Sequence, residues 1–198
     1  MKIMTQWLLA VAGLLMLSCQ TATPPNYYRL DAPSSLGAMA PGPSLGLAPV
    51  EIPEYLVRSG LVRDTNDLEV EVSTSERWAE PLESGIARIM ALNLARTLPT
   101  NDIRPYPWNN KRSPDIAIRI KVTELRNLPE RATLVAETVI STQDGQFTSE
   151  LISLQEPLTR SAQGDAIAAA YSALFAELSK ALAKKIQTMM AVKADRAS

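Results

Sequence analysis

The sequence predicts an α/β protein of the α+β type, a single domain in which a mostly antiparallel sheet packs against two principal helices. Three observations predict this class. Apolar and polar residues alternate from Ile116 to Thr123, as in a half-buried strand. Asp144-Gly145 separates two β-rich runs, which is a strong hairpin signal. Apolar residues recur every three or four positions in residues 82–98 and 161–191, as on one face of a helix.

The first residues predict a secretory signal peptide over 1–18. Lys2 precedes an apolar run from Trp7 to Leu17. This run is too short to span a bilayer, which requires about 20 apolar residues. Ser18 and Cys19 then mark the cleavage site, and Cys19 is the only cysteine. This arrangement resembles the lipobox of bacterial lipoproteins, in which the cysteine is acylated. The alternative is an ordinary signal peptide cut nearby, which would leave a free thiol.

The signal peptide sets the domain boundaries that we expect. Residues 19–26 form an acylated tether, 27–191 form the domain, and 192–198 form a frayed tail. Gln20 stands where Asp would retain many enterobacterial lipoproteins in the inner membrane. By that rule Gln20 favours the outer membrane.

Short strands and turns are predicted before the first helix. Residues 27–30 and 61–63 have strand character, and residues 53–56 indicate a turn or a short helix. In the extended stretch 44–52, Pro49 and the following Pro53 either place the strand at a sheet edge or end it. Leu68, Val70 and Val72 alternate with polar residues, which predicts a half-buried strand.

The first long helix is predicted to open within residues 77–82, with Pro81 at its first position, and to end at Pro99. Its apolar face consists of residues that we expect in the core: Leu82, Ile86, Ile89, Met90, Leu94 and Leu98.

Residues 103–106 then predict a short edge strand, and residues 115–155 a three-stranded antiparallel meander. The last helix begins near Ser161 and carries a continuous apolar stripe. Either this helix simply packs across the sheet, or its alanine-rich side also forms a groove for a partner or a lipid. The stripe consists of Ile167, Tyr171, Leu174, Leu178, Leu182 and Ile186, with Phe175 beside it.

Composition excludes several kinds of enzyme. The chain has no histidine, so a Ser-His-Asp triad, a Cys-His pair and a His-ligated metal are all excluded. With Cys19 acylated, no thiol and no disulfide remain. The formal net charge of −1 gives no reason to expect nucleic acid as a partner. We therefore expect no cofactor, no metal and no catalytic residue.

Several local stretches in a fixed order resemble one family. Residues 27–30, 50–56, 61–63 and 77–82 read YYRL, VEIPEYL, LVR and RWAEPL, and a meander and a long helix follow them. Together with the lipobox they resemble the ABC-type transport auxiliary lipoproteins, the group of PqiC, which is also called YmbA. The resemblance implies a non-enzymatic outer-membrane lipoprotein that acts in lipid trafficking. It also implies a periplasm-spanning, PqiB-like partner with MCE domains and a homo-oligomeric ring.

Three apolar candidates for partner contact each have a packing alternative. Trp78 is either a core aromatic under the first helix or an exposed anchor for a partner. Tyr55 and Leu56, on their proline-flanked turn, either contact a partner or pack against the sheet.

The charged candidates are treated in the same way. Arg58, Arg63 and Arg77 are either solvated or paired surface charges, or a rim that meets an acidic partner. Glu80 is interpreted as a helix-start residue rather than a catalytic acid.

Three functions remain open at this stage. The first is a docking component of an intermembrane lipid transport system. The second is an anchored regulator that binds an envelope enzyme such as a cell-wall synthase. The third, a hydrolase that uses a carboxylate pair, requires two carboxylates to converge in a cleft.

Overall fold

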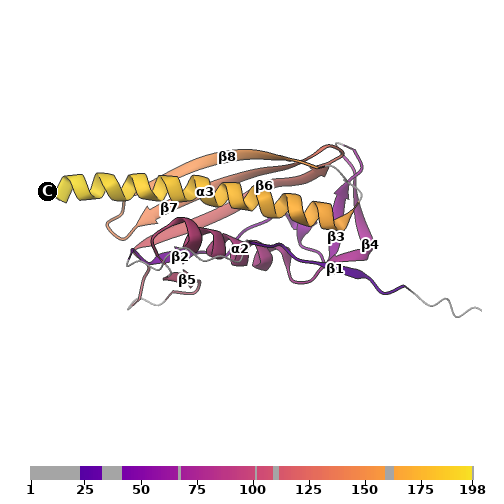
Figure 1. The fold of residues 1–198 in the computed structure, drawn as a ribbon, viewed down its shortest axis with the longest axis horizontal. Coiled ribbons are helices and arrows are strands. Elements are labelled where there is room, and N and C mark those ends of the chain that lie inside the picture. The colour runs from indigo at the N-terminus through magenta and orange to yellow at the C-terminus, as the bar shows by residue number, and fades with distance from the viewer. Residues whose placement is uncertain are drawn as a thin grey trace, which may run out of the picture.

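A computed structural model describes residues 23–32, 42–66, 68–100, 102–108, 112–158 and 163–197. The predicted signal peptide, the cleavage site at Ser18 and Cys19, Gln20 and the helix start at Ser161 lie outside the described residues. Figure 1 shows the described elements.

The larger sheet has five strands in the order β5-β2-β6-β7-β8. The long strands β6 (Ile116–Leu128), β7 (Arg131–Thr142) and β8 (Phe147–Pro157) form the antiparallel meander that the sequence predicts. Gly145, in the turn between β7 and β8, has φ +83°, a conformation that glycine adopts without a steric penalty. The short strands β2 (Leu45–Leu47) and β5 (Ile103–Pro105) are added in parallel, and β5 is an edge strand as predicted.

The smaller sheet has three strands in the order β1-β4-β3. β3 (Gly60–Asp64) and β4 (Val70–Trp78) form an antiparallel hairpin, and β1 (Asn26–Tyr28) pairs in parallel with the end of β4. This sheet lies at the end of the molecule opposite the C-terminus (Figure 1). The prediction of one mostly antiparallel sheet is therefore refined to two sheets, in which the longest pairings are antiparallel.

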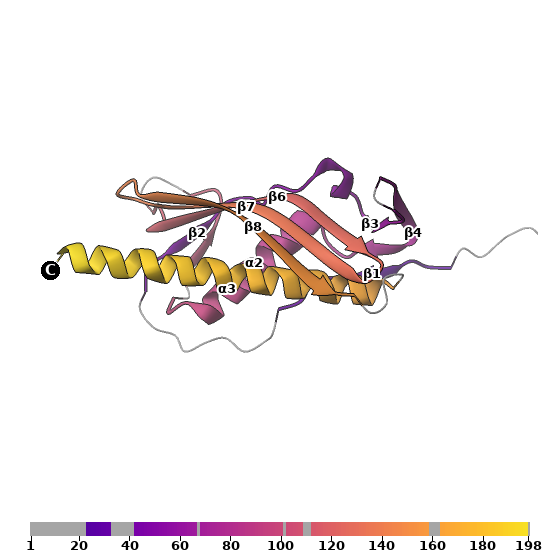
Figure 2. The ribbon, with the colours of Figure 1, turned by 90° about the horizontal axis from the view of Figure 1, so that it is seen from above.

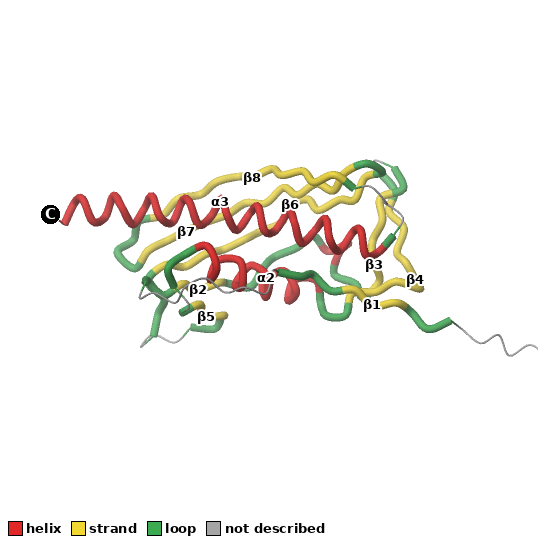
Figure 3. The backbone as a smooth tube through the Cα atoms, in the orientation of Figure 1, coloured by secondary structure: helices red, strands yellow, loops and turns green. Residues whose placement is uncertain are grey.

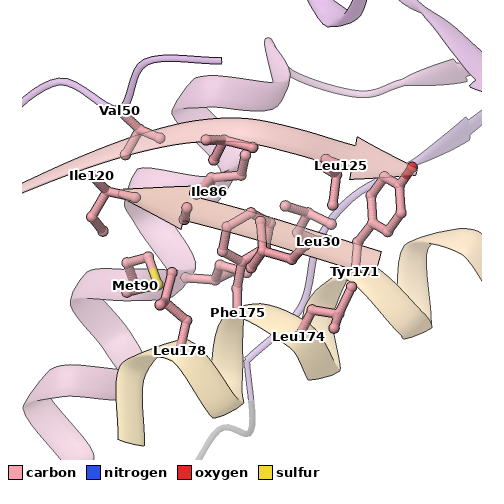
Figure 4. Close-up of a cluster of buried hydrophobic side chains, with 14 of the residues drawn as sticks. Leu30, Val50, Ile86, Met90, Ile120, Leu125, Tyr171, Leu174, Phe175 and Leu178 are labelled. Carbon is pink, nitrogen blue, oxygen red and sulfur yellow. The ribbon is translucent and has the colours of Figure 1, made fainter. Parts of the chain in front are cut away.

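Two helices cover one face of the larger sheet. α2 (Leu82–Thr97) and α3 (Gly164–Ala197) lie side by side, and α3 runs along most of the molecule (Figures 2 and 3). Between helices and sheet lies the core, where Phe175 and Leu178 of α3 lie near Met90 of α2 and Ile120 of β6 (Figure 4). Every residue of the two predicted helical stripes is at most 5% exposed, which confirms both helical faces.

α3 is the one stretch of the described residues, from Gly164 to Val192, whose length and apolar composition would allow a helix to cross a membrane. More than half of its most apolar window is buried inside the domain. Packing in the core therefore accounts for this composition. The helix continues to Ala197, beyond the predicted end near residue 191.

The structure decides between the alternatives for β2 and corrects one prediction for α2. Of the alternatives for Pro49, the structure shows the second: β2 ends at Leu47, and it lies between β5 and β6 rather than at an edge. The segment 77–82 does not all belong to the helix start. Trp78 ends β4, and Pro81 is the cap residue before α2, because its fixed φ of −50° suits the entry to a helix.

A second correction concerns the first half of β4. Val70 and Val72 alternate with polar residues as predicted, yet they are 43% and 41% exposed, and the neighbouring Leu68 is 98% exposed. The alternation predicted a buried face, whereas the structure leaves this face uncovered.

Candidate partner-docking groove

A groove of about 380 Å³ lies between the short 3-10 helix η1 (Glu54–Leu56) and the start of α2. We call it the η1–α2 groove. It brings together two of the candidate contact residues, Arg58 and Trp78, from segments that are separated in the sequence. The lining residues are Val57, Arg58, Ser59, Trp78, Ala79, Glu80, Pro81, Leu82 and Glu83.

The floor of the groove is fixed by Trp78. This side chain is 7% exposed and stacks on Tyr171 of α3, with ring centroids 6.1 Å apart and planes inclined by 23°. Its backbone N–H donates to the carbonyl oxygen of Ser59 at 2.8 Å, and the next N–H, of Ala79, donates to the carbonyl oxygen of Tyr28 at 2.7 Å. These bonds tie the end of β4 to both neighbouring strands, so the floor is rigid.

The wall on the η1 side is held by packing. Leu56 is 3% exposed and anchors η1 in the core, and the Tyr55 hydroxyl donates to the carbonyl oxygen of Leu125 at 3.4 Å. Burial raises the pKa of Tyr55 above 10, so the hydroxyl remains a neutral donor at physiological pH. The Arg58 Nε donates to the carbonyl oxygen of Tyr55 at 2.9 Å, which places the guanidinium at the rim.

The opposite wall, at the start of α2, is held by the ion pair between Glu80 and Arg88. Glu80 Oε1 accepts from Arg88 Nε at 3.1 Å and from Arg88 Nη2 at 2.6 Å. The same Nη2 donates to the carbonyl oxygen of Leu30 at 2.7 Å. Arg88 therefore joins α2 to the segment after β1, and Glu80 holds its guanidinium in place, which agrees with a structural role for Glu80 at the helix start.

The groove offers a binding surface in which an apolar wall lies beside charge. Val57, 50% exposed, and Pro81 present apolar surface, while Arg58 and Glu83 present opposite charges. Such a surface accepts an apolar side chain of a partner together with a polar or acidic neighbour. Among the described residues no cluster of three or more Cys, Asp or Glu could hold a metal ion.

The remaining sequence candidates lie elsewhere. Arg63 does not line the groove, because its guanidinium pairs with Glu76 in the smaller sheet. Arg77 is partly buried and does not line the groove, and its Nε is buried without a hydrogen-bond partner in the described part of the chain. Leu56 and Trp78 are buried and support the groove from behind and below. Arg58 is the predicted residue whose side chain is exposed at the rim.

Sequence reasoning missed Val57, Ser59 and Glu83 as lining residues. Val57 and Ser59 follow η1, and Glu83 belongs to the first turn of α2. No local pattern brings these two segments together, because their proximity depends on the pairing of β3 with β4. The one signal in the sequence was the position of Val57 directly after the turn that Pro53 begins.

The alanine-rich side of α3 also borders a hollow, of about 540 Å³. Ala168, Ala169, Ala173 and Ala176 line it together with residues of the segment after β1. The structure thus shows a hollow where the sequence allowed a groove along the alanine-rich side. The apolar stripe of α3 is buried, as expected for a helix that packs across the sheet.

Comparison with known proteins places the chain in a family. The family model described as the ABC-type transport auxiliary lipoprotein component matches residues 28–183, which include the η1–α2 groove, α2 and the first part of α3. The chain belongs to this family. The predicted family resemblance is therefore confirmed.

Curated relatives and solved structures agree with this assignment. The chain is 24% identical over 149 residues to a protein named intermembrane transport lipoprotein PqiC, from Escherichia coli K12 and also from Shigella flexneri, covering 73% of this chain and 78% of the relative. A crystal structure of an uncharacterized protein is similar with a TM-score of 0.68 and 20% identity, covering 83% of this chain and 99% of that one. The crystal structure of protein XCC0632 from Xanthomonas campestris is similar with a TM-score of 0.61 and 14% identity, covering 87% of this chain and 100% of that one. These two structures share the fold.

Proposed function

We propose that this chain is an outer-membrane lipoprotein that serves as a non-enzymatic docking component of an MCE-type intermembrane lipid transport system. Acylated Cys19 holds it in the periplasmic leaflet, and the domain binds a PqiB-like, periplasm-spanning MCE protein, with several copies forming a ring. Membership of the transport auxiliary lipoprotein family over residues 28–183 carries this proposal. The relationship to PqiC supports a part in transport between membranes.

The η1–α2 groove is the surface that we assign to the MCE partner. Its floor and walls are fixed by hydrogen bonds, stacking and an ion pair, so binding costs little ordering of the groove itself. Arg58 at the rim then selects an acidic or polar group on the partner, while Val57 and Pro81 contact an apolar one.

The proposal is tested by affinity capture of the tagged lipoprotein from outer membranes in mild detergent, with mass spectrometry of the captured proteins. We expect an MCE-domain protein to be enriched. Arg58→Glu reverses the rim charge and should reduce its recovery at least about tenfold, because one lost charge-assisted contact corresponds to roughly 1.4 kcal/mol or more. Arg119→Glu is the matched control, since Arg119 is exposed on β6 and does not line the groove.

Two results would contradict parts of the proposal. Capture of a cell-wall synthase in place of any MCE protein would support an anchored regulator and refute the transport function. If Arg58→Glu and Arg119→Glu reduced the recovery of the MCE protein equally, the MCE protein would remain the partner, but the groove would be refuted as its binding surface.

A further inference from the structure

The hairpin of β3 and β4 leaves three apolar side chains at and near its tip without cover. Leu68 is 98% exposed near its tip, and Val70 and Val72 are 43% and 41% exposed on the first half of β4. We call these three residues the hairpin patch. Single exposed apolar residues are ordinary on a protein surface, but an alternating set on one strand face is the pattern of a face that contacts something apolar.

The position of α3 explains why the chain does not cover this patch. Val70 and Val72 share one face of β4. At the far end of the strand, beyond an irregularity in its pairing with β3, Trp78 packs against Tyr171 of α3. α3 begins at Gly164, whose N–H donates to Glu76 Oε1 at 3.1 Å. The helix therefore starts beside Glu76, and the part of β4 from Val70 to Val72 extends beyond it.

The tether leaves the domain from the same end. β1 runs parallel to β4, with Asn26 opposite Glu76, so the chain before Asn26 heads in the direction from which β4 comes. The smaller sheet also lies at the end of the molecule opposite the C-terminus (Figure 1). From Asn26 back to Cys19 an extended chain reaches at most about 25 Å. From Glu76 back to Leu68, the chain spans at most roughly 26 Å, and less in a straight line because the pairing of β4 is irregular between them.

The short tether identifies the occupant of the patch. If Cys19 carries acyl chains in a leaflet, the tether keeps this end of the domain within about 25 Å of that leaflet. The uncovered hairpin patch lies at the same end, so lipid is the apolar surface nearest to it. Tyr27, 62% exposed in the same sheet, is of the residue type that favours the membrane–water interface.

The charges of the hairpin favour one kind of lipid surface. Glu69 and Glu71 flank the patch and are exposed. The two basic residues nearest to them in the fold are engaged in ion pairs, Arg63 with Glu76 and Arg126 with Asp64. The hairpin thus has no basic cluster to attract anionic lipid, and its apolar side chains suit a zwitterionic phospholipid surface.

We propose that Leu68, Val70 and Val72 of the β3–β4 hairpin insert into the phospholipid surface that holds the anchor, as a second membrane contact that orients the domain. The inference rests on the acyl anchor of the proposed function and adds a site on the folded domain. With two contacts, the smaller sheet faces the membrane, and the turn between β7 and β8 faces the periplasm.

The experiment uses the acylated full-length lipoprotein in phosphatidylcholine vesicles. Cys19 is the only cysteine and its sulfur is blocked by acylation, so Leu68→Cys supplies the one thiol for an environment-sensitive NBD probe. Phe147→Cys is the matched control, because Phe147 is 74% exposed and begins β8 at the other end of the larger sheet. Phe147 pairs with Ser141 of β7, which in turn pairs with Ala117 of β6. Ala117 lies about 33 Å along β6 from Asn127, and Asn127 is the residue that contacts Asp64 of β3.

We expect a blue-shifted emission of the probe at position 68 and quenching by doxyl-labelled lipid at least twofold stronger than at position 147. Flotation of the vesicles reports the anchor separately. Protein that floats with the vesicles but shows no quenching at 68, or equal or stronger quenching at 147, overturns the inference while the anchor stands. Protein that fails to float overturns the anchor and the inference together, whereas capture of the MCE partner still tests the transport function.

Discussion

Asn127 joins the two sheets to α3, and its removal should be the most damaging single change of a buried polar group. Its Nδ2 donates to the carbonyl oxygen of Val62 at 2.7 Å and to the Tyr171 hydroxyl at 3.0 Å, and its Oδ1 accepts from the backbone N–H of Asp64 at 3.3 Å. The side chain is 3% exposed. The bulge in β6 between Val122 and Glu124 turns Asn127 inward, because an extra residue shifts the alternation of the strand.

The magnitude follows from the three groups that Asn127→Ala leaves without a partner. Each buried polar group that loses its hydrogen bond costs about 1–3 kcal/mol, so the free energy of unfolding should fall by about 3 kcal/mol or more. Tyr171→Phe removes one of the three partners and keeps the ring that stacks on Trp78. It should therefore cost only about 1 kcal/mol.

Urea unfolding of the two single variants and of the double variant measures these values. Because both changes remove the same bond, the double variant should lose less than the sum of the single losses, by about 0.5 kcal/mol or more. The reasoning is refuted if Asn127→Ala costs no more than Tyr171→Phe, or if the two losses add in full.

Three further predictions concern stability. Burial raises the pKa of Tyr171 above its usual 10, so the stability that its neutral hydroxyl provides is complete below pH 10 and is lost as the pH rises further. In urea unfolding, the free energy of unfolding should fall above pH 10, and the fall should be smaller in Tyr171→Phe. Hydrogen bonds from the Ser44 hydroxyl and N–H lower the pKa of Asp115 below 3.8, so Ser44→Ala should cost about 1 kcal/mol at pH 7, and the difference should shrink as acid protonates Asp115. A Cβ on Gly60 would clash with the backbone carbonyl oxygen of Ser73, so Gly60→Ala should lower the free energy of unfolding by about 1–3 kcal/mol in thermal unfolding. No loss would show that β3 shifts freely.

Much of the fold was predictable because its strongest signals are local. The alternation in β6, the Asp144-Gly145 turn and the stripes of α2 and α3 each depend on residues within one element, and the structure confirms them. The family was also predictable, since short segments in a fixed order identify it before any contact is known.

The groove was only partly predictable. Arg58 and Trp78 were both candidates, but a sequence cannot say that one would be exposed at the rim and the other buried in the floor. Arg63 has the same side chain as Arg58, yet Glu76 on the neighbouring strand engages it. Which arginine remains available to a partner depends on residues that approach from other strands.

The sequence by itself determined the elements, the core faces of both helices and the family of this protein, because periodicity and turn chemistry act between near neighbours in the chain. The tertiary structure alone decided that β2 lies inside a sheet, that η1 meets α2, and that Val70 and Val72 lie uncovered. Burial of a strand face requires a second element above it, and α3 begins too late to cover the start of β4. An apolar alternation specifies a face that seeks an apolar contact, and only the arrangement of the other elements determines whether that contact lies within the domain.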